Sequence, residues 1–369
     1  MTNITIQGAF LNENKTDSSS SSLAVSSHGD IPAGYFSLLM EYTSYTMIFV
    51  AAFGMAGNIL IIITYAKIGF SEPINISYFA LGISDIFCVT FLTWNAICFI
   101  PDFADSDVPF VSREIVIPTG GFTSDVFSKT TTWITAFISL ERCLCVVFPL
   151  KIKTIVRRRT TCLVISTIFV LTVLPLTGIV SYTYVLDYRY DSANNRTVLG
   201  VSIRNSSLTE SLASVNYIYK LVFLNIIPFT IILLSSIFLG IHLNRNASWR
   251  LGNSSQEAKT NTQASNNDDK AHRKYTKDMR VAKTVLAIAL AFIFLGTLST
   301  LRILIAMNWT DFRPIGSHAR LFRFTARLAF LLSLANSSVN FVIYYRMGSK
   351  FRATVKEIVF LCRKKDTTP

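Results

Sequence analysis

Seven long apolar blocks divide the chain and constrain its fold more than any other feature. Each block is long enough to cross roughly 30 Å of hydrocarbon as a helix. No water is present inside a lipid layer to satisfy backbone N–H and C=O groups, so each block must be helical. The sequence therefore predicts an all-α membrane protein whose seven transmembrane helices form a bundle at Tyr45–Lys67, Ile76–Ile100, Thr119–Phe148, Thr160–Tyr184, Val215–His242, Arg280–Met307 and Phe324–Tyr345.

Composition favours a membrane protein over a set of soluble domains. Hydrophobic residues make up 51% of the chain and charged residues only 15%, whereas ordinary soluble domains carry roughly 25% charged residues. The net charge of +13 would suit a nucleic-acid partner. The basic residues, however, are concentrated in particular loops and in the C-terminal tail, which is typical of orientation signals beside membrane spans. We expect a lipid bilayer, and no nucleic acid, as a partner.

Loop charge also predicts the orientation. The segment Lys151–Arg159 reads KIKTIVRRR, with five basic residues and no acid, and the tail beyond Tyr345 is basic as well. The N-terminal tail has Lys15 as its only basic residue. The positive-inside rule therefore predicts a multi-pass plasma-membrane protein with an extracellular N-terminus and a cytosolic C-terminus.

Polar segments flank and interrupt the spans. Residues 1–44 form a polar tail that buries too little apolar surface to fold alone, and residues 45–345 form the transmembrane domain. Within that domain, residues 243–277 read as a flexible third cytosolic loop. Residues 346–369 form a cytosolic tail, in which Ser349–Phe360 alternates basic and apolar residues as in a short amphipathic helix lying along the membrane.

Two kinds of covalent modification are predicted. Cys362, just beyond the amphipathic segment, is a candidate for palmitoylation. Outside the cell, N-glycosylation sequons begin at Asn3, Asn14, Asn195, Asn205 and Asn308.

Several short motifs occur in order on the apolar blocks. The third block ends in Glu141-Arg142, an acid and a base that are costly to place at the end of a membrane helix without a purpose. The other motifs are Gly57-Asn58 in the first block, Leu81-Gly-Ile-Ser-Asp85 in the second and Asn336-Ser-Ser-Val-Asn340-Phe-Val-Ile-Tyr344 in the seventh. Together they resemble the motifs of rhodopsin-like G-protein-coupled receptors over roughly residues 45–360.

The resemblance implies a receptor with no enzyme activity, which binds an extracellular small molecule or peptide and activates a heterotrimeric G protein in the cytosol. It also implies a switch at the inner ends of the helices, in which Arg142 pairs with Asp278 at rest. The switch residues are Glu141, Arg142, Asp278, Asn340 and Tyr344.

The chain departs from the family pattern at several positions. Cys143 replaces the usual tyrosine, Phe341 stands where proline is usual, and Gly296 and Leu298 replace the usual tryptophan and proline of the sixth helix. Neither cysteine of the usual outer disulfide is present, so no outer disulfide is expected.

Within this family the chain looks most similar to the molluscan chemosensory branch. The similarity lies in short sequence motifs such as Trp133-Ile-Thr-Ala-Phe137 and Glu141-Arg-Cys-Leu-Cys145. A neuropeptide receptor is the alternative within the family. A transporter would show internal repeats and broken helices, and a membrane enzyme would need an acid or histidine constellation within the spans. The sequence shows neither pattern.

Two groups of polar residues are candidates for binding. Asp85 is the only acid in its block, and Thr131, Asn336 and Asn340 align with the family residues that join it in a sodium pocket. No other cofactor is expected. Nearer the outer surface, Asp125, Lys129, Arg302 and Arg327 predict a cationic pocket with one acid, suited to a carboxylate or a zwitterion such as an amino acid or a peptide end. Arg323 lies near the same surface and is more simply an interfacial residue.

Overall fold

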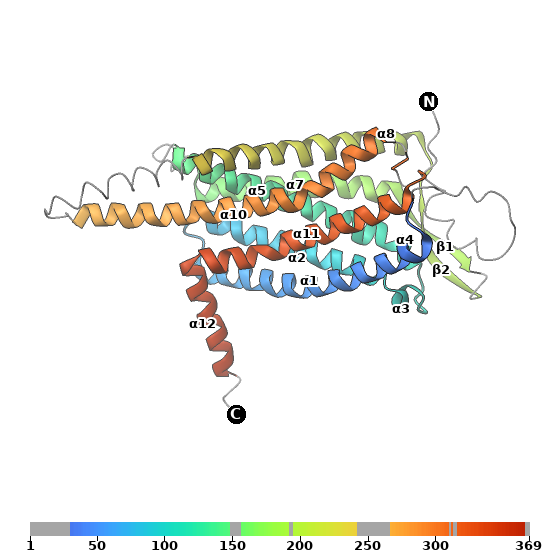
Figure 1. Ribbon diagram of the computed structural model, residues 1–369, viewed down its shortest axis with the longest axis horizontal. Helices are drawn as coiled ribbons and strands as arrows, with labels where there is room; N and C mark the ends of the chain where they lie inside the picture. Colours follow the sequence, from blue (N-terminus) through green and yellow to red (C-terminus); the bar gives the residue numbers. More distant parts are fainter. Residues whose placement is uncertain are drawn as a thin grey trace.

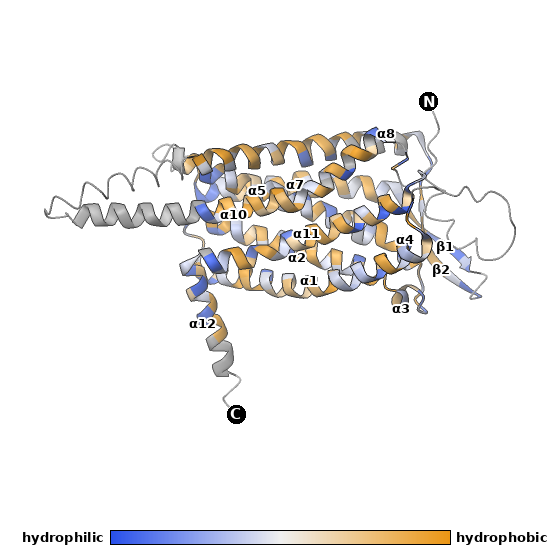
Figure 2. Ribbon diagram, in the orientation of Figure 1, coloured by the Kyte–Doolittle hydropathy of each residue, from blue (hydrophilic) through white to orange (hydrophobic). Residues whose placement is uncertain are grey.

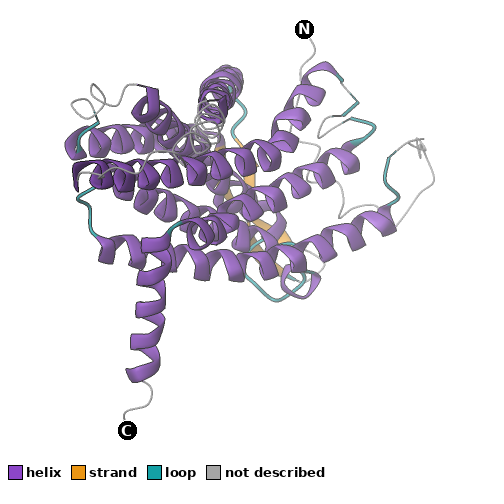
Figure 3. Cartoon of the chain, turned by 60° about the vertical axis from the view of Figure 1, so that its left-hand side comes forward, coloured by secondary structure: helices purple, strands orange, loops and turns teal. Residues whose placement is uncertain are grey.

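Long helices lie side by side in one bundle, and a two-stranded sheet covers one end of it (Figures 1 and 3). The computed structural model describes residues 30–147, 156–191, 195–241, 266–309, 311–312 and 316–365. In chain order the elements are α1 (Ala33–Ile68), α2 (Pro73–Ile97), α3 (Pro101–Ala104), α4 (Ser112–Val116), the π-helix η2 (Ile117–Phe122), α5 (Thr123–Val147), α7 (Arg158–Thr183), β1 (Tyr184–Asp191), β2 (Arg196–Ile203), α8 (Ser207–Ile218), the π-helix η3 (Tyr219–Ile226), α10 (Asn266–Asn308), α11 (Ala319–Met347) and α12 (Ser349–Lys365).

Seven of these segments form the bundle. Among the described residues, six are long and apolar enough to cross a membrane: α1, α2, α7, Ser207–Ile241, α11 and Lys283–Ala306 within α10. α5 carries four charged side chains, Asp125, Lys129, Glu141 and Arg142. It packs against α2, α7 and α10 and completes the predicted seven-helix bundle. Apolar residues predominate along the helices, and hydrophilic residues gather towards the two ends (Figure 2).

Most helices extend beyond the predicted spans. α1 begins at Ala33, before the predicted Tyr45, and α10 begins at Asn266, inside the segment 243–277 that was predicted to be a flexible loop. An apolar block marks only the part of a helix that lies in hydrocarbon, whereas the helix itself can continue through polar residues into the aqueous layer. α12 begins at the predicted Ser349 and continues to Lys365.

Among the described residues, a β-hairpin between α7 and α8 is the one pair of strands in an otherwise helical fold. β1 and β2 pair antiparallel from Tyr184↔Ile203 to Asp191↔Arg196, so Tyr184 belongs to a strand rather than to the fourth span. The strands read YVLDYRYD and RTVLGVSI, which are rich in the aromatic and β-branched residues that favour strands. We call the end of the bundle that carries this sheet the hairpin end, and the opposite end the α12 end.

The hairpin is held against the segment that leads into α5. The Glu114 carboxylate of α4 accepts hydrogen bonds from the Arg189 guanidinium of β1 and from the Val201 N–H of β2, the latter at 3.0 Å. A Cβ at Gly200 would overlap the Arg189 guanidinium, so a side chain at this position would force Arg189 to move. Leu199 adds a backbone bridge to Phe110. These contacts join the hairpin to the bundle.

The α1–α11 interface depends on close backbone approach. A Cβ at Gly54 would lie 2.2 Å from the Ser338 hydroxyl oxygen, and one at Gly57 would lie 3.0 Å from the Phe341 Cβ. Small residues of this kind let membrane helices pack closely. The buried Asn58 side chain then donates to the Ser337 carbonyl at 2.9 Å. The motif residues Gly57 and Asn58 therefore fix the position of the seventh helix.

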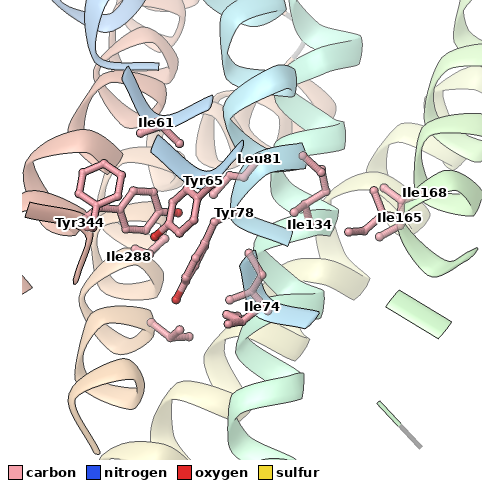
Figure 4. Packing of buried hydrophobic residues seen from close by; sticks show 14 of the residues in the cluster. Ile61, Tyr65, Ile74, Tyr78, Leu81, Ile134, Ile165, Ile168, Ile288 and Tyr344 are labelled. Carbon is pink, nitrogen blue, oxygen red and sulfur yellow. The ribbon is translucent and has the colours of Figure 1, made fainter. Parts of the chain in front are cut away.

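The main apolar core lies towards the α12 end. Tyr78 and Tyr344 have ring centroids 4.7 Å apart, and Tyr65 lies 5.2 Å from Tyr78 and 5.3 Å from Phe351 of α12 (Figure 4). α12 leaves the bundle sideways at Gly348 (Figure 1). Phe351 and Val355 are buried, whereas Arg352 and Lys356 are exposed, so this helix is amphipathic as predicted.

Three of the five predicted glycosylation sites lie in the described part of the chain. Asn195, Asn205 and Asn308 are exposed at the hairpin end, and Asn195 lies in the hairpin turn with φ 51°. Asn3 and Asn14 lie outside the described residues, as does the side chain of Cys362 in α12.

Removal of the Glu114 carboxylate should loosen the hairpin. We expect Glu114→Ala to lower the free energy of unfolding by about 1–3 kcal/mol, because it leaves the half-buried Arg189 and the Val201 N–H without their acceptor. Hydrogen–deuterium exchange of the β2 amides should become faster. Asp107→Ala is the matched control, because Asp107 pairs with Arg196 on the same hairpin but its side chain is 99% exposed. Equal effects of the two variants would contradict the anchoring role of Glu114.

Candidate functional site

The Glu141-Arg142 motif forms an ion pair at the α12 end of α5. Glu141 is buried, with a side chain only 1% exposed, and one of its carboxylate oxygens accepts a hydrogen bond from Arg142. The predicted partner Asp278 is in α10, but its side chain lies outside the described residues. In the described part of the chain, Arg142 therefore pairs with its sequence neighbour. Tyr344, a further predicted switch residue, lies in the aromatic core beside Tyr78.

Asp85 lies midway along α2 and is completely buried. Its carboxylate accepts a hydrogen bond from the Thr131 hydroxyl at 2.9 Å and from the Asn340 amide at 2.8 Å. The Thr131 hydroxyl oxygen also lies 3.0 Å from the Ser84 hydroxyl oxygen. Three of the four predicted sodium-pocket residues, Asp85, Thr131 and Asn340, are therefore in contact. Asn336 instead lines a neighbouring cavity.

The donor set around Asp85 suits a small hard cation. A carboxylate and two hydroxyls are oxygen ligands of the kind that such ions prefer. The buried Asn58 Oδ1 has no hydrogen-bond partner in the described chain. Asn340, however, presents its NH₂ group to Asp85, so its oxygen is not directed at the carboxylate.

A second charged cluster lies in the part of α5 nearer the hairpin end. The Lys220 ammonium of η3 lies 2.8 Å from Asp125 Oδ2, and the Lys129 ammonium lies 3.8 Å from Asp125 Oδ1. Lys129 also donates to the Asn225 side-chain oxygen at 2.7 Å. The predicted pair Asp125 and Lys129 thus extends to two residues of η3.

The π-helix explains why Lys220 and Asn225 both reach α5. Pro228 lacks an N–H and its ring would crowd the carbonyl four residues earlier, so the α-helical ladder widens just before it. The Asn225 amide fills part of the opened ladder by donating to the Lys220 carbonyl at 2.6 Å. Lys220 and Asn225 therefore both face the charged residues of α5.

Two small cavities adjoin this cluster, and both are lined by Ser128, Lys129 and Ser333. The first has a volume of about 40 Å³ and extends towards Asn225, Phe292 and Asn336. The second has a volume of about 60 Å³ and brings Arg302 of α10 to the same wall as Asp125 and Lys129. The structure therefore gathers three of the four predicted ligand-binding residues, Asp125, Lys129 and Arg302, around the second cavity.

Arg327, the fourth, lies elsewhere. Its guanidinium is buried among α1, α2 and α11, where it donates hydrogen bonds to Ser44 and Asn95. It also lies 4.6 Å from the centre of the Phe99 ring. Arg327 does not line either of the two cavities. The sequence prediction placed Arg327 near Asp125 because it measured depth along the helix but not the direction of the side chain.

Sequence reasoning also missed Lys220 and Asn225. Lys220 is the only acidic or basic residue in the sequence between Val215 and Ile241. The rule that selected Asp85, a lone charge in an apolar block, would also have selected Lys220. Asn225 gives no comparable signal, because an asparagine is less costly in a membrane helix than a charge.

Comparison with known proteins gives the fold and the family. The family description "7 transmembrane receptor (rhodopsin family)" matches residues 57–344. The crystal structure of squid rhodopsin is similar, with a TM-score of 0.61 and 17% sequence identity over 89% of this chain and 86% of that chain. No curated protein matches the sequence. Since the family match covers most of its length, the chain belongs to the rhodopsin family of seven-transmembrane receptors, which are signalling receptors rather than enzymes.

Proposed function

We propose that this G-protein-coupled receptor is a chemosensory receptor of the plasma membrane. In this proposal the hairpin end is extracellular and receives the ligand, and the α12 end is cytosolic and contacts the G protein. The observation that carries the proposal is the organisation of α5. One half of this helix holds the charged cluster beside two cavities, and its other end holds the buried Glu141–Arg142 pair.

The distribution of charge supports this orientation. Arg157 precedes α7 at the α12 end, Arg158 and Arg159 begin this helix, and α12 carries several more basic residues. Basic residues next to spans favour the cytosolic side. The sequons at Asn195, Asn205 and Asn308 would then be extracellular, with Asn3 and Asn14, and open to glycosylation. Cys362 would lie on the cytosolic side, where palmitoylation would hold α12 against the membrane.

The charged cluster supports a polar ligand on the extracellular side. Lys129 and Arg302 line the second cavity together with Asp125. Such a pocket is suited to a small molecule or a peptide end that carries a carboxylate. We assign Arg327 a supporting role, since its guanidinium ties α11 to α1 and α2 beside the pocket.

The cytosolic switch follows from the Glu141–Arg142 pair. In the resting receptor, Glu141 holds the Arg142 side chain against α5, and the predicted contact with Asp278 would bring α10 to the same residue. Release of Arg142 on ligand binding would open the α12 end for the G protein. Tyr344 and Asn340 couple this movement to the Asp85 network, because both belong to α11.

Sodium binding is a further part of the proposal. Asp85 and Thr131 would supply oxygen ligands to the ion, and Asn340 and Asn336 would complete the site after rotation of their side-chain amides. A bound sodium ion would neutralise the Asp85 carboxylate in the resting state. No other cofactor is proposed.

Neutralising Glu141 should raise basal signalling. We expect Glu141→Gln to activate the G protein without ligand, because an amide holds a guanidinium less strongly than a carboxylate does. Arg142→Ala should instead abolish activation while the receptor still reaches the cell surface. Nucleotide exchange on a reconstituted G protein measures both effects. Glu357→Gln is the control, since Glu357 is an exposed acid at the same end that pairs with Lys67. An unchanged response in Arg142→Ala would disprove the switch.

Sodium should lower the affinity for an activating ligand in the wild-type receptor and have no effect in Asp85→Asn. The amide cannot supply the charge that holds the ion, so the variant loses the resting state that sodium stabilises. The measurement is a ligand titration in sodium chloride and in potassium chloride at equal ionic strength. Identical affinities in the two salts for the wild-type receptor would remove the sodium site from the proposal.

Chemosensory function predicts where the receptor is made. We expect its transcript in sensory epithelium, where external chemicals reach the cell surface. In situ hybridisation on sensory and nervous tissue would test this. Expression confined to central neurons would favour the alternative, a neuropeptide receptor.

A further inference from the structure

The charged cluster beside the cavities does not leave its acid available. Both oxygens of Asp125 lie next to ammonium groups, one 2.8 Å from Lys220 and the other 3.8 Å from Lys129. A ligand amine would have to displace a lysine in order to reach Asp125. The structure therefore argues against Asp125 as the partner of a positively charged ligand.

The described side chains of the cluster carry a surplus of positive charge. Lys129 and Lys220 contribute two positive charges beside the single carboxylate of Asp125. The Lys220 ammonium also lies over an aromatic ring, 4.7 Å from the centre of Phe122. A ring face stabilises a cation without neutralising it. Surplus charge in a membrane bundle is costly and favours the entry of an anion.

The cavities show where an anion would enter. Lys129 lines both of them, and Asp125 and Arg302 line the second. The first cavity has a volume of about 40 Å³ and the second of about 60 Å³, which suits a small ligand or one arm of a larger ligand. A carboxylate in the second cavity would lie against Lys129 and Arg302, on the same side as the Asp125 carboxylate.

From these contacts we infer that Asp125 is an internal substitute for the ligand, and that the ligand is a carboxylate that displaces it from Lys129. This inference rests on the proposed function, because it concerns the same extracellular pocket. Asp125 balances part of the positive charge while the pocket is empty of ligand. When a carboxylate binds, it takes over Lys129 together with Arg302, and Asp125 keeps only Lys220.

The displacement also gives the ligand a means of moving helices. Asp125 and Lys129 belong to α5, whereas Lys220 and Asn225 belong to η3. A new anion at Lys129 weakens its contacts with Asp125 and Asn225, and so changes how these two helices are held together. The span Ser207–Ile241, which contains η3, can then shift relative to α5.

Thermal unfolding of the purified full-length receptor tests the inference. The probes are succinate, acetate and ethylammonium, each at the same ionic strength. We expect the two carboxylates, and not ethylammonium, to raise the unfolding temperature of the wild-type protein. Asp125→Asn should bind succinate at least about fivefold more tightly, because a competing carboxylate has been removed. Lys129→Gln should lose the succinate effect. Asp105→Asn, an exposed acid at the hairpin end, should match the wild type.

Other outcomes overturn the inference. If Asp125→Asn weakens succinate binding, or if ethylammonium stabilises the wild type and not Asp125→Asn, then Asp125 contacts the ligand directly. If no carboxylate stabilises any variant, the pocket does not bind this class of ligand. If Asp125→Asn does not fold, the double variant Asp125→Asn/Lys220→Gln replaces it in the same measurement. This variant removes one negative and one positive charge and so preserves the net charge of the cluster.

A separate measurement distinguishes this inference from the proposed function. Arg142→Ala should lose G-protein activation and keep the stabilisation by succinate. If succinate has no effect while the wild type still activates its G protein, the ligand class is wrong and the receptor function stands.

Discussion

A charge inside a hydrocarbon layer must find its partner within the protein, and this constraint organises the bundle. The charged residues of α5 illustrate it at both ends. Glu141 and Arg142 neutralise each other within one turn of helix, whereas Asp125 draws Lys129 and Lys220 to itself from two different helices. The first arrangement keeps the charges local. The second holds two spans together, so a change in charge at that point acts on the packing of the helices.

The same constraint determines how much could be predicted from the sequence. The seven spans followed from block length, because an apolar block of about 20 residues has the length of a spanning helix, which satisfies its own backbone groups in lipid. Asp85 was predicted to have polar partners for the same reason, and Thr131 and Asn340 are indeed in contact with it. Arg327 shows the limit of this reasoning. Its depth in the seventh block predicted a place in the cationic pocket with Asp125, whereas its guanidinium instead donates to Ser44 and Asn95.

Features outside the hydrocarbon were harder to predict. The helical start of α10 and the hairpin lie in segments where water can satisfy the backbone, so several conformations are open to them. Strand-forming residues were present in Tyr184–Ile203, but the interpretation of Tyr184 as the end of a span hid them. Glu114 and Arg189 are far apart in the chain, and nothing in either neighbourhood indicated that they meet. The chain thus uses an ion pair and a backbone bridge to hold the hairpin against the segment that leads into α5.

The π-helix η3 has a consequence for comparisons between receptors. A π-helical turn holds one residue more than an α-helical turn over a similar length. Relative to Pro228, every residue before the wide turn is therefore displaced by one position from where regular helical spacing would put it. An evolutionary insertion or deletion of a single residue in Tyr219–Ile226 would rotate the part of this span that precedes the π-helix by roughly 100° and present a different set of side chains to α5. In this region, residues that are equivalent in a gapless alignment need not be equivalent in space.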